Sequence, residues 1–213
     1  MILGFDTSSA HVGAALMDGS GIVAAAHEDM ARGQAERLMP LLEEVLAQGG
    51  ANWQDLTAIG VGIGPGNFTG VRLSVAAARG LALSLNIPAV GVSLLEAVAL
   101  DTPGPVLACL NAPRDQAYVQ SQRIVPPIPA QLIAISGMPD AWAQSGLTCV
   151  GPAAALVAEH LGTKAVPARH APAEAIAHIA ATRWQDKPAR PAPLYLKPAD
   201  AAPSRDAPPV ILE

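Results

Sequence analysis

The stretch GIGPGNFTGVRLS, residues 62–74, places four glycines between an apolar run and a predicted helix. Where side chains are missing, backbone N–H groups can converge on an anion, and a helix N-terminus adds a partial positive charge. Amide and hydroxyl side chains in the same stretch can donate hydrogen bonds to phosphate oxygens. The pattern therefore indicates a phosphate-binding loop with the candidate residues Gly64, Gly66, Asn67, Thr69, Gly70 and Arg72.

The same glycines are also typical of a tight turn in which a helix packs closely against a sheet. No Gly-Lys-Ser/Thr follows them, so the stretch is not a P-loop. Asn86 and Ile87 occupy the region where a dinucleotide-binding loop would have its acidic residue. Both interpretations, anion binding and close packing, are therefore kept.

A second polar turn, Asp6-Thr7-Ser8, ends the first predicted strand. In open sheets, ligands gather beyond the carboxyl ends of strands, and the glycine stretch also follows a strand. The two turns are therefore predicted to face one cleft, where Asp6 would hold a hydrated Mg²⁺ and Thr7 and Ser8 would contact phosphate. In the alternative, these three side chains only satisfy the backbone of their own turn.

Residues able to perform catalysis are sparse and dispersed. No two histidines stand three or four positions apart, as a metal-binding pair on one helical face would require. The sequence contains neither HExxH nor G-x-S-x-G, and the adjacent Glu43 and Glu44 diverge on a predicted helix. We therefore predict no catalytic residue and no metal site, and assign no ligand role to the histidines: His11, His27, His160, His170 and His178.

The elements that must position the two turns follow from hydrophobic periodicity and turn residues. The first hundred residues read βββ-α-β-α-β-α, and the order restarts after Pro103-Gly104-Pro105. We therefore predict two α/β lobes of similar plan, 1–103 and 104–213, each with a mixed sheet flanked by helices. The predicted strands of the first lobe are 2–5, 11–17, 22–28, 58–63 and 89–92, and its helices are 34–48, 71–85 and 94–100, the last capped by Ser93.

The second lobe is less well specified, because most of the 20 prolines lie in it. The Pro- and Ala-rich tail after Asp186 is predicted to be extended or partly disordered, apart from a short strand at 194–196. Whether this tail returns to the first lobe is left open. The other predicted strands are 106–111, 117–124, 131–135 and 148–150, and the helices lie near Ala141 and over 153–161 and 174–184.

Composition limits the classes of function. Apolar residues make up 51% of the 213 residues and charged residues 15%, which is typical of a globular protein. With a net charge of −5 and dispersed Lys and Arg, direct tight binding to nucleic acid is not expected. Cys109 and Cys149 form no CxxC motif, and the sequence shows neither a signal peptide nor an apolar run of membrane length. We therefore expect a cytoplasmic protein that does not contact a membrane.

Three stretches, FDTSS, GIGPGNFTGVRLSVAAARGLAL and IPAVGVS, resemble the TsaB (YeaZ-type) family. The resemblance implies a two-lobed actin/sugar-kinase/Hsp70-like (ASKHA, ribonuclease H-like) fold. It also implies a non-catalytic subunit that supports the catalytic paralogue TsaD, together with the ATPase TsaE, in transferring threonylcarbamoyl to N6 of adenosine 37 in ANN-decoding tRNAs. On this view the chain alone requires no cofactor, ATP or ADP and Mg²⁺ act in or near the TsaD complex, and tRNA is contacted only indirectly.

The resemblance further implies that the first two predicted helices form the interface, both in a homodimer of the isolated protein and with TsaD. In the second helix, Ala76, Gly80 and Ser84 recur every four residues and leave a shallow groove. Gly80 costs about 1 kcal/mol of helix propensity, so we expect a close neighbour, either the lobe's own sheet or a partner's helix. The predicted interface residues are Leu38, Met39, Leu42, Val45, Leu46, Val71, Leu73, Ala76, Gly80, Leu83 and Ser84.

The chain departs from the family pattern at three positions. Gln34 stands where many relatives carry His, and Asn111 and Pro113 replace an acidic and a basic residue. These replacements weaken the case for a charged ligand or a metal in this subunit. Two other functions stay open: an independent ASKHA-fold nucleotide-binding kinase or hydrolase, and a glycoprotease-like peptidase.

Overall fold

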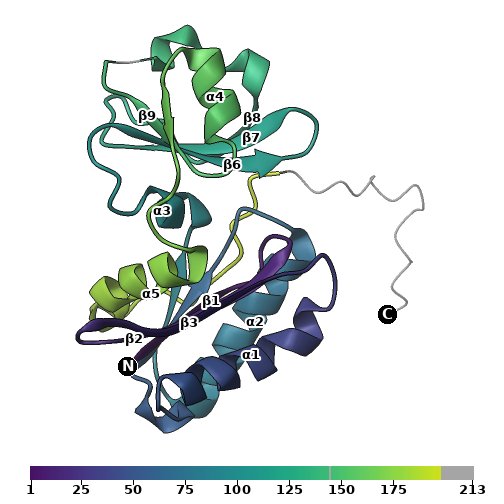
Figure 1. The fold of residues 1–213 in the computed structure, drawn as a ribbon, viewed down its shortest axis with the longest axis vertical. Coiled ribbons are helices and arrows are strands. Elements are labelled where there is room, and N and C mark those ends of the chain that lie inside the picture. Colours follow the sequence, from purple (N-terminus) through teal and green to yellow (C-terminus); the bar gives the residue numbers. More distant parts are fainter. Residues whose placement is uncertain (144, 198–213) are drawn as a thin grey trace, which may run out of the picture.

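The computed structural model describes residues 1–143 and 145–197, which form two lobes arranged along the longest axis of the molecule (Figure 1). The first lobe is built on a five-stranded sheet with the order β3-β2-β1-β4-β5. β1, β4 and β5 are parallel, whereas β2 and β3 form the predicted antiparallel meander beside β1. The strands are β1 Ile2–Asp6, β2 His11–Asp18, β3 Gly21–Asp29, β4 Ala58–Gly62 and β5 Ala89–Val92.

Three helices cover the two faces of this sheet. α1 (Gln34–Gln48) and α2 (Phe68–Leu85) lie on one face, and α5 (Pro172–Arg183) lies on the other (Figure 1). Side chains alternate between the two faces along each strand. Leu3 of β1 therefore packs in an apolar cluster with the buried residues of α1, whereas Gly4 contacts α5 on the other face.

The helix α1 begins and ends at the predicted residues, because its apolar positions recur at helical spacing. Arg37 fixes its outer side, donating to Glu28 of β3 at 2.6 Å and to Glu44 at 2.6 Å. These hydrogen bonds lower the pKa of both carboxyl groups, so charge as well as apolar contact holds α1 on the meander. The buried residues that pack it on the sheet are Leu38, Leu41, Leu42, Val45 and Leu46.

The second lobe has a sheet of the order β10-β9-β6-β7-β8, covered on one side by α4 (Ala154–Leu161). β10 was not predicted, and the helix predicted near Ala141 is a single 3₁₀ turn. The strands are β6 Val106–Ala112, β7 Gln116–Gln122, β8 Gln131–Ala134, β9 Thr148–Val150 and β10 Lys164–Val166. The 3₁₀ turns are η1 Trp53–Asp55, η2 Ile135–Gly137, η3 Asp140–Trp142 and η4 Trp184–Asp186.

An apolar cluster joins the two lobes. α3 (Leu94–Ala99), which Ser93 caps as predicted, lies between the sheets. The cluster contains Leu95 of α3, Val106 of the second sheet and Ile176 of α5, all of them buried. The lobes therefore share a core at this point, and their relative placement is fixed by apolar packing.

The helix α5 packs on the sheet of the first lobe, which the sequence did not indicate. We expected it in the second lobe, because it follows the elements of that lobe along the chain. Instead, Gly4 of β1 and Gly60 of β4 bring the strands close to Ala177 and Ala180 of α5. The prediction that 104–213 forms a single lobe is therefore corrected, since the chain returns to its first sheet once the second sheet is complete.

The segment after α5 also returns to the first lobe, which answers the question left open by the sequence. Arg79 of α2 donates to the Pro191 carbonyl oxygen at 2.7 Å, and Leu194 N donates to the Ile63 carbonyl oxygen at 2.8 Å. Residues 194–196, predicted as a strand, have no regular secondary structure. The rest of the predicted tail, 198–213, lies outside the described residues.

Replacing Gly4 by alanine is expected to lower the free energy of unfolding by about 1–3 kcal/mol, the usual effect of overpacking a core. A Cβ atom there would lie 2.6 Å from the Ala173 carbonyl oxygen and 2.7 Å from Ala177 N, and backbone atoms cannot rotate away. Urea unfolding followed by circular dichroism measures the change. Gly19→Ala is the control, because a Cβ at Gly19 meets nothing within 4 Å. Equal stability of the two variants would contradict the close packing of α5 on β1.

Candidate functional site

The two polar turns singled out from the sequence lie in direct contact. Thr7 Oγ1 donates to the Gly70 carbonyl oxygen at 2.7 Å, and Asn67 N donates to the Ser8 carbonyl oxygen at 2.6 Å. Asp6, Thr7 and Ser8 are fully buried by this contact. The turns were predicted to face one cleft. Instead they pack directly on each other, through one backbone hydrogen bond and one from the Thr7 side chain.

The glycines of residues 62–74 make this contact possible. A Cβ atom at Gly66 would clash with the Ser8 carbonyl group, and one at Gly70 would clash with the Thr7 carbonyl oxygen. Gly64 has a φ of 91°, in the region that favours glycine. Close packing, the second interpretation of these glycines, accounts for all three, and binding of an anion here stays a prediction.

The N-terminus of α2 is capped by a side chain of the same stretch. Asn67 Oδ1 accepts hydrogen bonds from Thr69 N at 3.0 Å and from Gly70 N at 3.1 Å. α2 therefore begins at Phe68, three residues before the predicted start, because we did not identify Asn67 as its cap. The N–H groups of Thr69 and Gly70 are therefore already satisfied within the loop.

Arg72 is held at the surface by two aromatic residues that we did not single out from the sequence. Its Nε donates to Tyr195 Oη at 2.8 Å, and its Cζ lies 3.7 Å from the centroid of the Phe68 ring. Phe68 is 53% exposed and Tyr195 is 47% exposed. The one signal in the sequence was the position of Phe68, a large apolar residue in a stretch of small and polar ones.

The carboxylate of Asp6 is occupied by its own turn. Oδ2 accepts from Ser8 N at 3.1 Å and from Ser8 Oγ at 2.8 Å, and it lies 3.0 Å from His11 Nε2 without an aligned hydrogen bond. Oδ1 is buried, has no hydrogen-bond partner among the described residues, and lies against the Gly62 backbone. A hydrated Mg²⁺ needs room for its water ligands, so this enclosed carboxylate does not fit one. Within 1–143 and 145–197, no group of three or more possible metal ligands occurs.

The positions that depart from the family pattern lie at the start of α1 (Gln34), in β6 (Asn111) and in the turn that follows β6 (Pro113). Gln34 Nε2 donates to the Met30 carbonyl oxygen at 3.2 Å, which ties the start of α1 to the end of β3. Pro113 lies in the turn between β6 and β7, where Arg114 and Asp115 have φ values of 63° and 52°. An acidic and a basic side chain are therefore still present at this turn, one and two residues after Pro113.

The predicted interface residues divide into two sets. The apolar stripe of α1 and the first turn of α2 pack in the first lobe's own core, so their assignment to an interface is corrected: Leu38, Leu42, Val45, Leu46 and Val71. The sequence showed that this stripe is apolar but not that the sheet covers its full width. Leu73 is half-buried and packs against the same core. The exposed set is Met39, Ala76, Gly80, Leu83 and Ser84.

The exposed side of α2 carries an apolar surface, which we call the outer α2 face: Ala76, Gly80, Leu83 and Ser84. A Cβ atom at Gly80 would meet nothing within 4 Å, so the lobe's own sheet does not require this glycine. Leu83 is 83% exposed, the second-highest value among the large apolar residues of the described chain. The face lies on the side of the sheet away from α5 (Figure 1).

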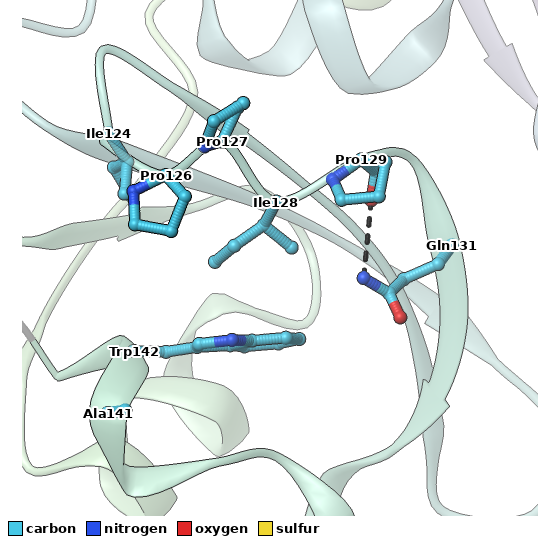
Figure 2. Close-up of a pocket in the computed structure, with 8 residues that line it drawn as sticks. All are labelled: Ile124, Pro126, Pro127, Ile128, Pro129, Gln131, Ala141 and Trp142. Carbon is cyan, nitrogen blue, oxygen red and sulfur yellow. Dashed lines mark hydrogen bonds between the residues drawn. The ribbon is translucent and has the colours of Figure 1, made fainter.

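A shallow hollow of about 280 Å³ lies on the second lobe (Figure 2). The ring of Trp142 forms one wall, facing Ile128 and Pro126, and Gln131 lies at the rim. Apart from Gln131, its lining residues are apolar, so they offer no acid, base or metal ligand. The hollow lies in a different lobe from the glycine loop and contains no predicted site residue.

Comparison with known proteins places the sequence in a family. Residues 21–138 match the family described as TsaD: tRNA N6-adenosine threonylcarbamoyltransferase. An uncharacterized protein of Mycobacterium tuberculosis is 35% identical over 187 residues, which cover 81% of this chain and 79% of the relative. The tRNA threonylcarbamoyladenosine biosynthesis protein TsaB of Escherichia coli is 38% identical over 122 residues, which cover 55% of this chain and 52% of the relative.

Solved structures confirm the predicted two-lobed actin/sugar-kinase/Hsp70-like fold. A protein from Pseudomonas aeruginosa with similarity to peptidase YeaZ has a TM-score of 0.76 and 25% identity, covering 92% of this chain and 99% of its own. Component A of (R)-2-hydroxyglutaryl-CoA dehydratase from Acidaminococcus fermentans has a TM-score of 0.55 and 12% identity, covering 86% and 98%, and shows the fold alone. In the part of the chain that the structure describes, no helix is both long and apolar enough to cross a bilayer.

Replacing Gly70 by alanine is expected to lower the melting temperature in the absence of any ligand, because the new Cβ clashes with the Thr7 carbonyl oxygen. Overpacking of this kind costs about 1–3 kcal/mol. Differential scanning calorimetry with and without ATP and Mg²⁺ measures the effect. Gly50→Asn is the control, since the space around Gly50 is open and asparagine tolerates its φ of 66°. A Gly70→Ala variant that melts normally and loses only a stabilisation by nucleotide would show instead that the loop binds an anion.

Proposed function

Because this chain belongs to the TsaD family of tRNA N6-adenosine threonylcarbamoyltransferases and is a TsaB (YeaZ)-type member of it, we propose that it serves threonylcarbamoyladenosine biosynthesis as a non-catalytic partner subunit. The catalytic partner is a TsaD-like subunit that transfers threonylcarbamoyl to N6 of adenosine 37 in ANN-decoding tRNAs. A TsaE-like ATPase completes the complex. The names of the relatives favour this function over an independent kinase, a hydrolase or a peptidase.

The glycine loop supports a role without chemistry of its own. In this chain its backbone donors bond to Ser8 and to the Asn67 side chain, and its glycines accommodate the turn at residues 6–8. The loop therefore acts as a rigid support at the start of α2. We infer that ATP or ADP and Mg²⁺ act in or near the partner subunits and are not required by this chain alone.

The outer α2 face is the observation that carries the proposal. A glycine inside a helix costs about 1 kcal/mol relative to alanine. Among residues 1–143 and 145–197, no atom lies within 4 Å of the position that a Cβ at Gly80 would take, so no close approach compensates for this cost. Leu83 exposes most of its apolar surface three residues later on the same face. A helix of another chain, packed closely at Gly80 and covering Leu83, would account for both residues.

One face can hold one partner at a time. We infer that the isolated protein forms a homodimer through the outer α2 face, with Met39 of α1 at its margin, and that a TsaD-like subunit displaces the second copy. The net charge of −5 is unfavourable for gripping phosphates, so tRNA is bound by the partner subunits and reached only indirectly by this chain.

Substitutions on the outer α2 face are expected to separate stability from association. Gly80→Ala should raise the free energy of unfolding by up to about 1 kcal/mol, because alanine favours the helix and its Cβ has open space. The same variant should weaken binding to a TsaD-like subunit, and Leu83→Glu should weaken it by about tenfold or more, corresponding to at least 1.4 kcal/mol. Isothermal titration calorimetry and urea unfolding measure the two quantities.

The matched control is Leu156→Glu, which places the same charge on an exposed leucine of α4 in the second lobe. It should leave the dissociation constant unchanged. Wild-type affinity in both Gly80→Ala and Leu83→Glu would exclude the outer α2 face as the interface.

Reconstitution tests the function itself. Purified TsaD-like and TsaE-like subunits, supplied with tRNA, ATP and the threonylcarbamoyl precursors, should form threonylcarbamoyladenosine only when this chain is added. Mass spectrometry of nucleosides released from the tRNA measures the product. Leu83→Glu should reduce product formation together with binding, and the isolated chain should turn over neither ATP nor peptides. Robust turnover by the isolated chain would contradict a non-catalytic role.

A further inference from the structure

The two cysteines of the sequence, distant along the chain, lie on neighbouring strands of the second sheet. Cys109 is on β6 and Cys149 is on β9, and these strands are parallel with Leu107 opposite Cys149. Because side chains alternate along a strand, Cys109 projects to the same face as Leu107, and so does Cys149. Both thiols belong to the apolar cluster beneath α4, and both residues are fully buried.

The thiols interact with each other and with polar neighbours. Cys149 Sγ lies 3.5 Å from Thr163 Oγ1, and Cys109 Sγ lies 3.3 Å from the Leu107 carbonyl oxygen. A hydrogen bond between the two thiols raises the pKa of Cys109 and lowers that of Cys149, and the Thr163 hydroxyl lowers the pKa of Cys149 further. Cys149 is therefore the thiol that ionises first, and Cys109 keeps the proton that it donates to the Leu107 carbonyl oxygen.

One side chain, Thr163, lies between Cys149 and a hollow at the surface. A surface hollow of about 480 Å³ is lined in part by Leu147, Gly162 and Thr163. Thr163 is half-buried, so it contacts the hollow on one side and Cys149 on the other. β9 has only three residues and is followed directly by Gly151, whose φ of 109° favours glycine.

We propose that Cys149 and Cys109 form a redox-active dithiol in which a peroxide-class oxidant reacts at Cys149 and Cys109 resolves the product into a reversible disulfide. In the first step the Cys149 thiolate attacks one peroxide oxygen, the O–O bond breaks, and the products are a sulfenic acid and water after protonation of the leaving hydroxide. In the second step Cys109 sulfur attacks the Cys149 sulfur, and its proton leaves with the hydroxyl group as water. Two thiols and one hydrogen peroxide thus give one disulfide and two waters.

The disulfide would join β6 to β9 inside the second lobe, on the face beneath α4. The outer α2 face and the glycine loop lie in the first lobe, so this site is independent of the proposed function. The inference can therefore hold or fail whether or not the chain supports a TsaD-like subunit.

The test uses the full chain with millimolar hydrogen peroxide, followed by alkylation of the remaining thiols and mass spectrometry. We expect the intact mass to fall by two hydrogen atoms, a peptide linked through Cys109 and Cys149, and full reversal by dithiothreitol. Before oxidation, Cys149 should alkylate at least about tenfold faster than Cys109 near neutral pH. Because the sequence has only two cysteines, each signal has a single assignment.

Two variants test the order of the steps. Cys109→Ser should trap the sulfenic acid at Cys149, detected as a dimedone adduct, whereas Cys149→Ser should leave Cys109 unmodified under the same conditions. Circular dichroism establishes that each variant is folded, and the wild-type result stands independently of both. Three outcomes would overturn the proposal: thiols that react only at the rate of global unfolding, oxidation beyond the sulfenic acid without a disulfide, or a disulfide that links two chains.

Discussion

The first lobe depends on a close contact between the turn that follows β1 and the loop that follows β4. Asn67 N donates to the Ser8 carbonyl oxygen, and Thr7 Oγ1 donates to the Gly70 carbonyl oxygen. The contact exists only because Gly66 and Gly70 lack side chains where the other turn approaches. α2 begins inside the contact, so the contact determines where the helix starts and which of its sides faces outward. The orientation of the outer α2 face thus depends on packing at the N-terminal end of the helix.

A similar close approach on the opposite face of the sheet places the second lobe. Gly4 and Gly60 let the backbones of β1 and β4 approach α5, whose facing residues include Ala177 and Ala180. α5 is also part of the apolar cluster shared by both lobes, through Ile176. The helix that seals the first sheet therefore also fixes the second lobe relative to it. A chain whose core is built from small aliphatic residues and few aromatics can use such backbone approaches, since large side chains would hold the elements apart.

Hydrophobic periodicity and the order of elements were sufficient to predict the strands of the first sheet, the helix α1 and the division into two lobes. Each of these follows from spacing within one stretch of the sequence. Periodicity did not predict features that depend on contacts with a distant part of the chain. The packing of α5 on the first sheet depends on glycines more than a hundred residues earlier in the chain. Leu42 is buried by the sheet, and the sequence of α1 alone does not show how wide a surface the sheet covers. The candidate site divides in the same way. That both turns follow strand ends was predictable. Their direct contact, the cap at Asn67 and the contact of Tyr195 with Arg72 depended on side-chain directions and on the returning tail.

An anion-binding loop and a close-packed turn both require glycine. In the first a backbone approaches a phosphate, and in the second two backbones approach each other. The two kinds of loop differ in the hydrogen-bond acceptors of their backbone N–H groups. Here Asn67 N bonds to Ser8, and Thr69 N and Gly70 N bond to the Asn67 side chain. A ligand that used these three groups would have to break these bonds, and each buried group left unpaired costs about 1–3 kcal/mol. The satisfied loop holds the start of α2 in one arrangement, and a preorganised helix loses less conformational freedom when a partner binds. If the outer α2 face binds the partner as we propose, this loop contributes to association by holding the helix that carries the face.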